Sequence, residues 1–499
     1  MKILIANPPA YLWDESRRYV QGGSRWSHSE KIERGSVPRM LRKGKYPYTP
    51  YPFYLGYAAS YLSIVADVYF VDGVALNYNQ DDFKDKVKQI SPDLLVMETP
   101  TVSFPLIMRL VDDIKSELDL KVAIAGAHVS ARHTEEMNYY PQVDFSLVNE
   151  YEETLMELVK KNLTPGDVRG LVYRSGTKIK FNGLRQVKKD ISQYPFPFRD
   201  SSIAYYDDFT LVGHPNIQML SSRGCPVGCN FCYTTIYFEN PIYRPRKAEN
   251  VVEEINELID RFNPKQLYFD DDTISISPKY ISELSRTFVK EKVDIPWTCM
   301  ADITVKREVV ELMKKAGCIG MKFGVESVSP ETLKRMHKGI ITEDKTLRFR
   351  SMLKEVGLWA HATFSLGHPG DSRESILSTI RFANLLKPNS VQMSMATPLP
   401  GTHFYNEAMS NEWLSTTDWN EFDGAKGSVL NYPHLSKEDI DQLYNLFQRE
   451  WKKTQHSLIF AAGNMIKKRK LYAEKIFSEL SHKSSLNVSG KQTARSSRK

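Results

Sequence analysis

The sequence predicts an α/β protein built from two successive domains and a helical C-terminal region. Short apolar runs alternate with helical patterns over residues 1–160, and the alternation returns with different spacing over residues 206–410. Residues 161–205 lack this rhythm and are predicted to be a linker, whereas residues 411–499 are mainly helical in pattern and end in a basic tail. Because strands that alternate with helices form parallel sheets, each block should contain one such sheet.

The first block is typical of a doubly wound parallel sheet. Ligands of such sheets bind at the carboxyl ends of the strands, so candidate binding residues should follow each strand. The predicted strands cover residues 2–8, 67–73, 93–100, 121–126 and 144–150, and the predicted helices cover residues 54–65, 81–90 and 103–118.

The second block predicts six βα units, which suit an open or partial barrel with its chemistry at the C-terminal ends of the strands. Between the blocks, residues 169–183 predict a hairpin, and the prolines of residues 193–200 indicate a connecting segment. The predicted barrel strands cover residues 216–222, 266–272, 297–302, 320–327, 360–367 and 390–398, with helices over residues 248–262 and 342–357 among those between them.

Composition narrows the class of protein. The chain has 499 residues and only five cysteines, too few for a disulfide framework, and three of them are clustered. This clustering predicts metal binding in a reducing compartment. The N-terminus lacks the pattern of a signal peptide, and no run of about 18 apolar residues predicts a membrane span. We therefore expect a cytoplasmic protein, with peripheral membrane contact as a further expectation.

Charge is concentrated at the C-terminus. The chain carries a net charge of +7, and residues 461–499 hold ten Lys or Arg and two acids, which leaves the rest nearly neutral. A basic tail predicts a polyanionic neighbour, either a membrane surface or nucleic acid. The alternative is a solvated, partly disordered tail that binds nothing. Residues 443–470 also fit a helix at a membrane surface, although such an apolar stripe more often packs on its own domain. That stripe contains Leu443, Phe447, Trp451, Leu458, Ala462 and Met465.

The stretch SSRGCPVGCNFCYTT (residues 221–235) predicts an iron–sulfur cluster. Thiolates are the usual ligands of such clusters, and three thiolates on a four-iron cubane leave one iron open to a substrate. Gly224 and Gly228 allow a tight loop, and Phe231 can exclude solvent. A zinc site is the alternative, but Cys299 and Cys318 are not spaced as further zinc ligands. The clustered cysteines are Cys225, Cys229 and Cys232.

This motif resembles the cluster-binding signature of the radical S-adenosylmethionine (AdoMet, SAM) superfamily, and the resemblance covers about residues 214–405. It implies a 4Fe–4S cluster that holds AdoMet on its open iron and cleaves it reductively to a 5′-deoxyadenosyl radical. The stretch YFDDD (268–272), the stretch GVES (324–327) and the turn SLGHPGDS (365–372) match the family's AdoMet-contacting segments. The cofactor-binding residues that the resemblance implies here are Phe231, Asp270, Asp271, Asp272, Glu326, Gly367 and Pro369.

The first block resembles the cobalamin-binding domain that precedes a subclass of these enzymes. Residues 92–101, 123–130 and 144–155 match its motifs, with departures at Ala125, Ala127 and residues 149–151. Residues 72–77 read DGVALN and lack the D-x-H-x-x-G motif, so cobalamin would bind without a histidine ligand from that position. A domain that has lost cobalamin is the alternative. The cobalamin contacts implied are Asp72, Gly73, Thr99, Gly126, His128, Ser130 and Glu150.

The stretch GGSRW, within the insertion at residues 11–53, resembles segments of members that modify lipids and tetrapyrroles, namely hopanoid-biosynthesis proteins, calditol synthase and the anaerobic magnesium-protoporphyrin ester cyclase. The alternative is that the insertion is only a surface loop. We therefore expect modification of an unactivated carbon of a small-molecule or lipid substrate, by cobalamin-dependent methyl transfer or by radical cyclisation or coupling. An external one-electron donor of the flavodoxin or ferredoxin type is expected. The alternatives are an RNA-modifying enzyme, which the lack of an RNA-binding module disfavours, and a non-catalytic electron-transfer protein.

Overall fold

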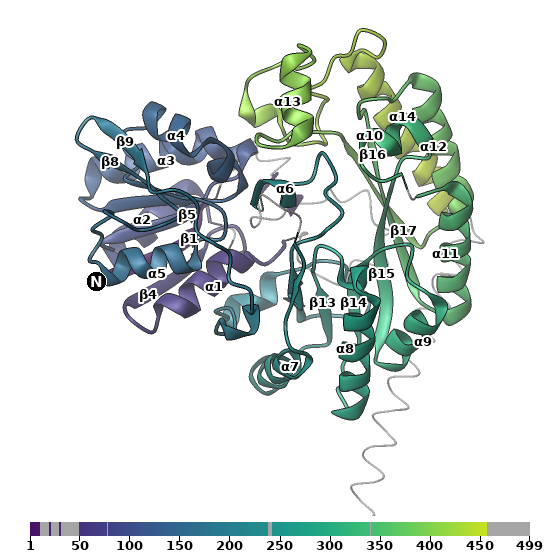
Figure 1. Ribbon diagram of the computed structural model, residues 1–499, viewed down its shortest axis with the longest axis horizontal. Helices are drawn as coiled ribbons and strands as arrows, with labels where there is room; N and C mark the ends of the chain where they lie inside the picture. Colours follow the sequence, from purple (N-terminus) through teal and green to yellow (C-terminus); the bar gives the residue numbers. More distant parts are fainter. Residues whose placement is uncertain are drawn as a thin grey trace, which may run out of the picture.

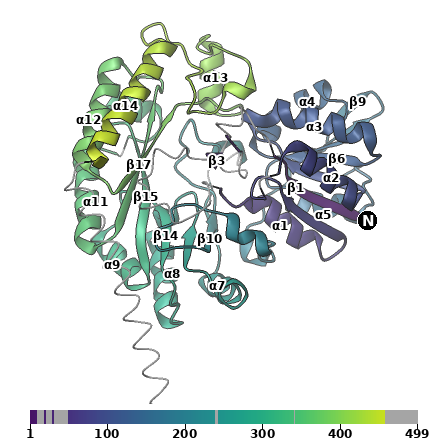
Figure 2. The ribbon, with the colours of Figure 1, turned by 180° about the vertical axis from the view of Figure 1, so that it is seen from behind.

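The computed structural model describes residues 1–9, 19–20, 29–30, 49–76, 78–237, 242–339 and 341–456. Two large sheets stand side by side, with the short helix α6 (Thr234–Tyr237) between them (Figures 1 and 2). Most of the insertion at residues 11–53 and all of the basic tail lie outside the described residues. Of the insertion, β2 (Tyr19–Val20) and β3 (Ser29–Glu30) form an antiparallel pair.

The first sheet confirms the predicted doubly wound topology. Five of its strands are parallel in the order β4-β1-β5-β6-β7. Successive strands are added first on one side of β1 and then on the other, so the switch in strand order lies between β1 and β5. The antiparallel strands β8 and β9 extend the sheet at one edge. Each predicted strand is present, within a few residues of its expected bounds. The strands are β1 (Lys2–Asn7), β4 (Asp67–Asp72), β5 (Leu94–Glu98), β6 (Lys121–Ala125), β7 (Phe145–Leu147), β8 (Leu171–Ser175) and β9 (Lys178–Phe181).

Helices cover both faces of this sheet. On β1, Ile3 and Ile5 pack toward α1 and α5, while Leu4 and Ala6 face the opposite core. Alternate side chains of a strand point to opposite faces, so a strand buried on both sides must be apolar throughout. The helices of this unit are α1 (Phe53–Leu62), α2 (Gln80–Ile90), α3 (Phe104–Glu117), α4 (Ala127–Tyr139) and α5 (Glu152–Lys160).

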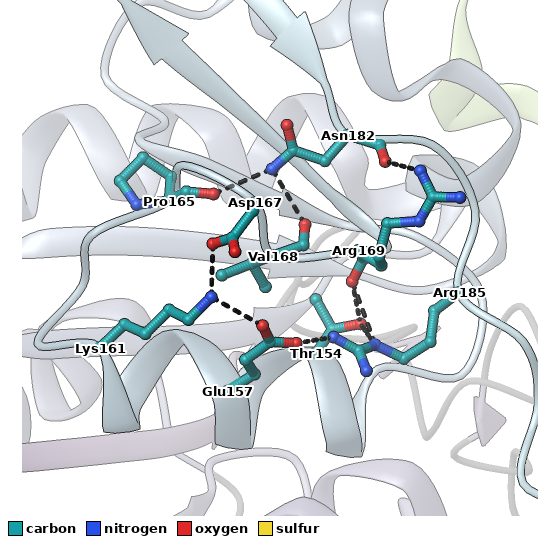
Figure 3. Close-up of polar contacts among 9 residues, drawn as sticks. All are labelled: Thr154, Glu157, Lys161, Pro165, Asp167, Val168, Arg169, Asn182 and Arg185. Atoms are coloured by element: carbon teal, nitrogen blue, oxygen red, sulfur yellow. Dashed lines mark hydrogen bonds and ion pairs between the residues drawn. The ribbon is translucent and has the colours of Figure 1, made fainter.

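The hairpin β8–β9 belongs to the first sheet, although the sequence analysis places it in a linker. Its flanking residues are tied to α5 by polar contacts (Figure 3). Arg185 forms an ion pair with Glu157, and Thr154 Oγ1 donates a hydrogen bond to the Arg169 carbonyl at 2.9 Å. The hairpin itself was predictable from local sequence, whereas its pairing with β7 is a long-range contact. The domain boundaries themselves stay a prediction.

The second sheet is the predicted open barrel. Its six strands are parallel and follow chain order. The strands are β10 (Asn216–Met219), β13 (Gln266–Phe269), β14 (Trp297–Ala301), β15 (Cys318–Glu326), β16 (Trp359–Leu366) and β17 (Ser390–Met395). The helices on its outer side are α7 (Ala248–Phe262), α8 (Pro278–Lys290), α9 (Arg307–Lys315), α10 (Pro330–Arg335), α11 (Glu343–Val356) and α12 (Arg373–Leu386).

A buried ion pair closes the N-terminal end of the barrel. On β15, Met321 and Phe323 belong to the core under the outer helices, so Lys322 points into the barrel. Its ammonium group pairs with Asp208, from the segment before β10, and both side chains are nearly inaccessible to solvent. The sequence analysis expects the chemistry of the barrel at the opposite, C-terminal end of the strands.

The C-terminal region packs on the barrel. The helices α13 (His403–Ser410) and α14 (Lys437–His456) flank a largely irregular segment that contains a short 3₁₀ helix, η6 (Trp419–Glu421). Leu443, Phe447 and Trp451 of α14 are buried, and α14 contacts α12 and β17. This half of the apolar stripe packs on its own domain, whereas Leu458, Ala462 and Met465 lie outside the described residues. Within the described part of the chain, no helix is both long and apolar enough to span a membrane.

Replacing Lys322 by methionine should destabilise the protein, because it leaves the Asp208 carboxylate buried without its counter-charge. We expect a loss of about 3 kcal/mol, measured as a lower urea midpoint. The double variant Asp208→Asn, Lys322→Met should recover most of this loss, and Lys290→Met, at an exposed position, is the control. A single variant as stable as the parent would contradict the role of the pair.

Candidate active site

The predicted cluster loop runs from β11 (Ser222–Arg223), which pairs with β12 (Arg244–Pro245), to α6. Gly224 and Gly228 adopt positive φ angles of 83° and 67°, which glycine tolerates without strain. Cys229 is buried, and Cys225 and Cys232 are half-buried. The chain thus turns sharply on both sides of Cys225, as the sequence predicts.

The three clustered cysteines have raised pKa values. Burial raises the pKa of Cys225 to about 11 and that of Cys229 to about 12. Burial also raises the pKa of Cys232. Without a metal, thiols with such pKa values stay protonated at neutral pH, so cluster binding must release their protons.

The donor set fits an iron–sulfur cluster better than a single metal ion. Over the described residues, no group of three or more His, Cys, Asp or Glu side chains could hold one ion. A cubane does not require such convergence, because each thiolate binds a different iron. Cys299 and Cys318, the other cysteines, are fully buried in the core on β14 and β15. The zinc alternative therefore lacks its ligands in this part of the chain.

Two aspartates that follow β13 fasten the cluster loop. Asp272 accepts hydrogen bonds from the Gly224 backbone N–H at 2.9 Å and from the Tyr233 hydroxyl at 2.7 Å. Asp271 accepts from the backbone N–H and the hydroxyl of Ser221, at 3.1 and 2.8 Å. Asp270, which precedes them in the sequence, is also buried. The structure gives these carboxylates a role in holding the loop, and their contact with AdoMet stays a prediction.

Glu326 ends β15 next to a lysine that the sequence analysis missed. Its Oε1 accepts a hydrogen bond from Lys338 Nζ at 2.7 Å. A Cβ atom on Gly324 would lie 2.3 Å from this oxygen and 2.8 Å from Nζ. Any larger residue at position 324 would therefore clash with the Glu326–Lys338 pair. Burial opposes a charge on Lys338, but Glu326 raises its pKa above the usual range, and so do Cys229 and Cys232 in their thiolate form. A charged ammonium group therefore lies near the cluster cysteines.

The position of Lys338 depends on how its segment docks. The segment RMHKG (335–339) reads as an ordinary solvated basic stretch, and no spacing rule links it to the cysteines. In the fold, His337 Nδ1 donates to the Gly228 carbonyl at 3.2 Å, and Asn230 Nδ2 donates to the Arg335 carbonyl at 2.8 Å. These contacts bring the segment against the cluster loop, which sequence reasoning had no signal to detect.

The turn after β16 also lies against the cluster loop. Asp371 accepts hydrogen bonds from the backbone N–H groups of Gly367 and His368, at 3.0 and 3.1 Å, and so closes the turn that contains Pro369. The His368 ring lies 5.0 Å from the Phe231 ring, centroid to centroid. Burial lowers the pKa of His368 to about 3, so the imidazole is neutral and packs as an aromatic ring.

Three of the predicted cobalamin residues use their side chains within the protein. Asp72 accepts a hydrogen bond from the Tyr206 hydroxyl at 3.0 Å. His128 packs its ring 4.4 Å from that of Phe104, centroid to centroid. Glu150 forms ion pairs with two arginines of the barrel. These side chains are therefore committed to protein contacts, and their contact with cobalamin stays a prediction.

The other four predicted cobalamin residues, which are Gly73, Thr99, Gly126 and Ser130, lie at the carboxyl edge of the first sheet. Gly73 and Thr99 follow β4 and β5, and Gly126 follows β6 with a φ of 113°, a conformation that favours glycine. A Cβ atom on Gly126 would meet nothing closer than the Thr99 nitrogen at 3.7 Å. Ser130 Oγ donates to the Gly126 carbonyl at 2.8 Å. The edge thus keeps an open backbone turn of the kind that a ligand can approach.

This edge meets the C-terminal end of the barrel. A Cβ atom on Gly401, in the turn after β17, would lie 2.7 Å from Ala131 Cβ on α4 and 3.4 Å from Ile236 on α6. The first sheet, the helix after the cysteines and the last barrel turn therefore come together at one place (Figure 1). The predicted cluster and cobalamin segments belong to the two sides of this junction.

Comparison with known proteins agrees with this geometry. A family model described as the radical SAM superfamily matches residues 219–383. An uncharacterized methyltransferase of Pyrococcus horikoshii is 30% identical over 398 residues, which cover 79% of this chain and 85% of that protein. The anaerobic magnesium-protoporphyrin IX monomethyl ester cyclase of Rubrivivax gelatinosus is 23% identical over 375 residues, 71% of this chain and 66% of that protein.

Among solved structures, the radical SAM methyltransferase TsrM from Kitasatospora setae, with cobalamin and a 4Fe–4S cluster bound, is similar with a TM-score of 0.62. The match covers 90% of this chain and 85% of TsrM at 16% identity, so it shows a shared fold. The relative that is 30% identical carries the family assignment. This chain therefore belongs to the radical SAM superfamily of enzymes.

Proposed function

We propose that this enzyme uses a 4Fe–4S cluster on Cys225, Cys229 and Cys232 to cleave AdoMet, and cobalamin in its first domain to methylate an unactivated carbon. The observation that carries the proposal is the three-thiol glycine turn at the C-terminal end of a six-stranded parallel barrel. When bound, the cluster supplies the electron that splits AdoMet into methionine and the 5′-deoxyadenosyl radical, and cobalamin supplies the methyl group.

The protein's own charges suit the methionyl end of AdoMet. That end carries a carboxylate and an ammonium group, and Lys338 and Glu326 offer the opposite charges at hydrogen-bond distance from one another. Both lie at the end of the barrel where the cysteines are, and Phe231 with His368 covers one side of the loop. Lys338 would thus bind the carboxylate of AdoMet, while the aromatic rings keep water from the site.

Cobalamin binding is supported by topology and by the open turn. Ligands of doubly wound sheets bind at the carboxyl edge near the switch in strand order, here between β1 and β5. Gly126 and Thr99 lie on this edge, and the edge meets the barrel near Gly401. TsrM, whose fold this chain shares, binds both cofactors.

Methyl transfer is the reaction we favour over cyclisation, because the relative at 30% identity is a methyltransferase. Modification of a lipid-type or other small-molecule substrate, reduction by a flavodoxin- or ferredoxin-type donor, and membrane contact by the basic tail are further proposals. Leu443, Phe447 and Trp451 are buried on the barrel, so these three side chains are not available for such a contact.

The fate of AdoMet tests the proposed function. The full chain is reconstituted anaerobically with iron and sulfide, reduced with dithionite, and assayed by mass spectrometry with and without hydroxocobalamin. We expect 5′-deoxyadenosine from radical cleavage, and S-adenosylhomocysteine only when cobalamin is present. A full cluster that gives neither product would instead support an electron-transfer protein, and 5′-deoxyadenosine alone would favour cyclisation or coupling.

Replacing Cys229 by alanine should abolish cluster binding, because two thiolates cannot hold the cubane in place of three. Iron and acid-labile sulfide would be measured after anaerobic reconstitution, together with the visible absorbance of the cluster. Cys299→Ala is the matched control, since that cysteine is buried in the core and should leave the cluster content unchanged. Full cluster content in Cys229→Ala would overturn the ligand assignment.

Replacing Lys338 by methionine should weaken AdoMet binding and leave the cluster in place. Loss of a hydrogen bond to a charged group predicts a rise of about tenfold to a hundredfold in the dissociation constant of AdoMet. Equilibrium binding to the reconstituted protein measures it, with Lys334→Met on the exposed side of α10 as the control. Unchanged affinity in Lys338→Met would show that the ammonium group does not contact AdoMet.

A further inference from the structure

Both ends of the cluster loop are held by the first domain. Arg223 precedes Cys225 by two residues, and Tyr237 follows Cys232 by five, at the end of α6. Arg223 contacts residues at the start of α5, and Tyr237 contacts α1. The barrel strand before the loop is therefore not its only support, because the loop is also anchored on two helices of the first domain, α5 and α1.

The first anchor is a buried ion network. Arg223 Nη1 lies 2.8 Å from Glu152 Oε1 and 3.3 Å from Glu150 Oε1. Arg244, on the strand paired with Arg223, binds both oxygens of Glu150, at 2.6 and 2.9 Å. All four side chains are almost fully buried. Two arginines and two glutamates thus meet away from water, where removing one partner is costly.

The first domain fixes where the carboxylates lie. Asn149, directly before Glu150, has a left-handed φ of 63°, and its N–H donates to Ser130 Oγ at 2.8 Å. The preceding residue, Val148, donates its N–H to the Gly170 carbonyl at 2.9 Å. The backbone around Glu150 is thereby tied to α4 and to the β8–β9 hairpin, and none of these ties involves the barrel.

Aromatic rings enclose the arginine. The guanidinium carbon of Arg223 lies 4.8 Å from the ring centroid of Tyr54, 4.5 Å from that of Tyr57 and 5.1 Å from that of Tyr194. These rings exclude water and attract the cation. Tyr54 also stacks on Tyr237, with centroids 5.5 Å apart, so one tyrosine of α1 contacts both ends of the loop.

We propose that Arg223 is a positioning residue of the iron–sulfur cluster, and that the acidic end of the first sheet, Glu150 and Glu152, holds the cluster loop in place through it. The cluster site is then complete only when the first domain is docked on the barrel. This inference rests on the proposed function, because it assumes that the cysteines bind a cluster. The cysteines remain the ligands, and Arg223 acts through the backbone that joins it to Cys225.

The test compares Arg223→Met and Arg223→Lys in the full chain with Lys322→Met. The last variant breaks a buried ion pair at the far end of the barrel, so it controls for lost stability without touching the loop. After anaerobic reconstitution, three quantities are measured: the electron paramagnetic resonance spectrum of the reduced cluster, the rate of iron release to a chelator, and the thermal midpoint. Glu150→Gln is the fourth variant, in case Arg223→Met does not fold.

In Arg223→Met and Glu150→Gln we expect iron release about tenfold faster than in the parent and an altered resonance spectrum. Arg223→Lys keeps the charge but lacks the planar guanidinium that packs among the tyrosine rings, so it should recover part of the effect. Lys322→Met should lower the thermal midpoint with the parent spectrum and release rate.

Unchanged cluster properties in both Arg223→Met and Glu150→Gln would overturn the positioning role. The same shifts in Lys322→Met would also overturn it, since they would reflect stability alone. A parent protein that binds no cluster would instead refute the proposed function, so the two failures are distinguishable.

Discussion

The pairing of Arg223 and Arg244 with Glu150 and Glu152 is the interaction on which the rest of the active-site arrangement depends. It lies between the two domains, and it joins the β11–β12 pair next to the cluster loop to the segment between β7 and α5 of the first domain. A charge that stays buried without its partner is costly, so removing one half of this network destabilises the docked arrangement. The two Arg223 contacts therefore couple domain docking to the shape of the loop.

Other charged side chains surround the cluster loop near that junction. Asp272 and Asp271 hold the loop from the barrel side, and the Lys338 ammonium group, paired with Glu326, lies near the thiols. A cluster with thiolate ligands is anionic, and a nearby ammonium group offsets part of that charge. Hydrogen bonds and charges around a cluster tune its reduction potential, so we expect Lys338 to affect the potential of a bound cluster without binding iron.

The segment between α13 and α14 also contacts the first domain. Trp419 of η6 packs edge-on against His128, 5.3 Å between centroids, and Arg132 of α4 lies over the Trp419 ring at 5.4 Å. The predicted cobalamin residue His128 thus contacts a segment almost three hundred residues away in the chain. Irregular segments that bridge two sheets in this way leave no periodic pattern, which explains why local sequence did not reveal the contact.

Much of the fold could be predicted because its signals are local. The parallel strands of the two sheets carry short apolar runs, and the six barrel strands appear where the sequence indicates them. The cysteine loop was also predictable, because its three ligands and two glycines fall within nine residues. The hairpin β8–β9 was recognised, but its place in the first sheet depends on pairing with β7, which the local pattern does not specify.

By itself, the sequence determined the α/β class, the order of the strands along the chain, the cluster cysteines and the family resemblance. Each of these is encoded in residues that are neighbours in the chain. Only the tertiary structure decided which charges meet. Glu150, predicted to contact cobalamin, is bound by Arg223 and Arg244, which lie 73 and 94 residues away in the sequence. The physical reason is that a buried carboxylate is stabilised by whichever cation the packing of the two sheets brings within hydrogen-bond distance, and no local pattern records that distance.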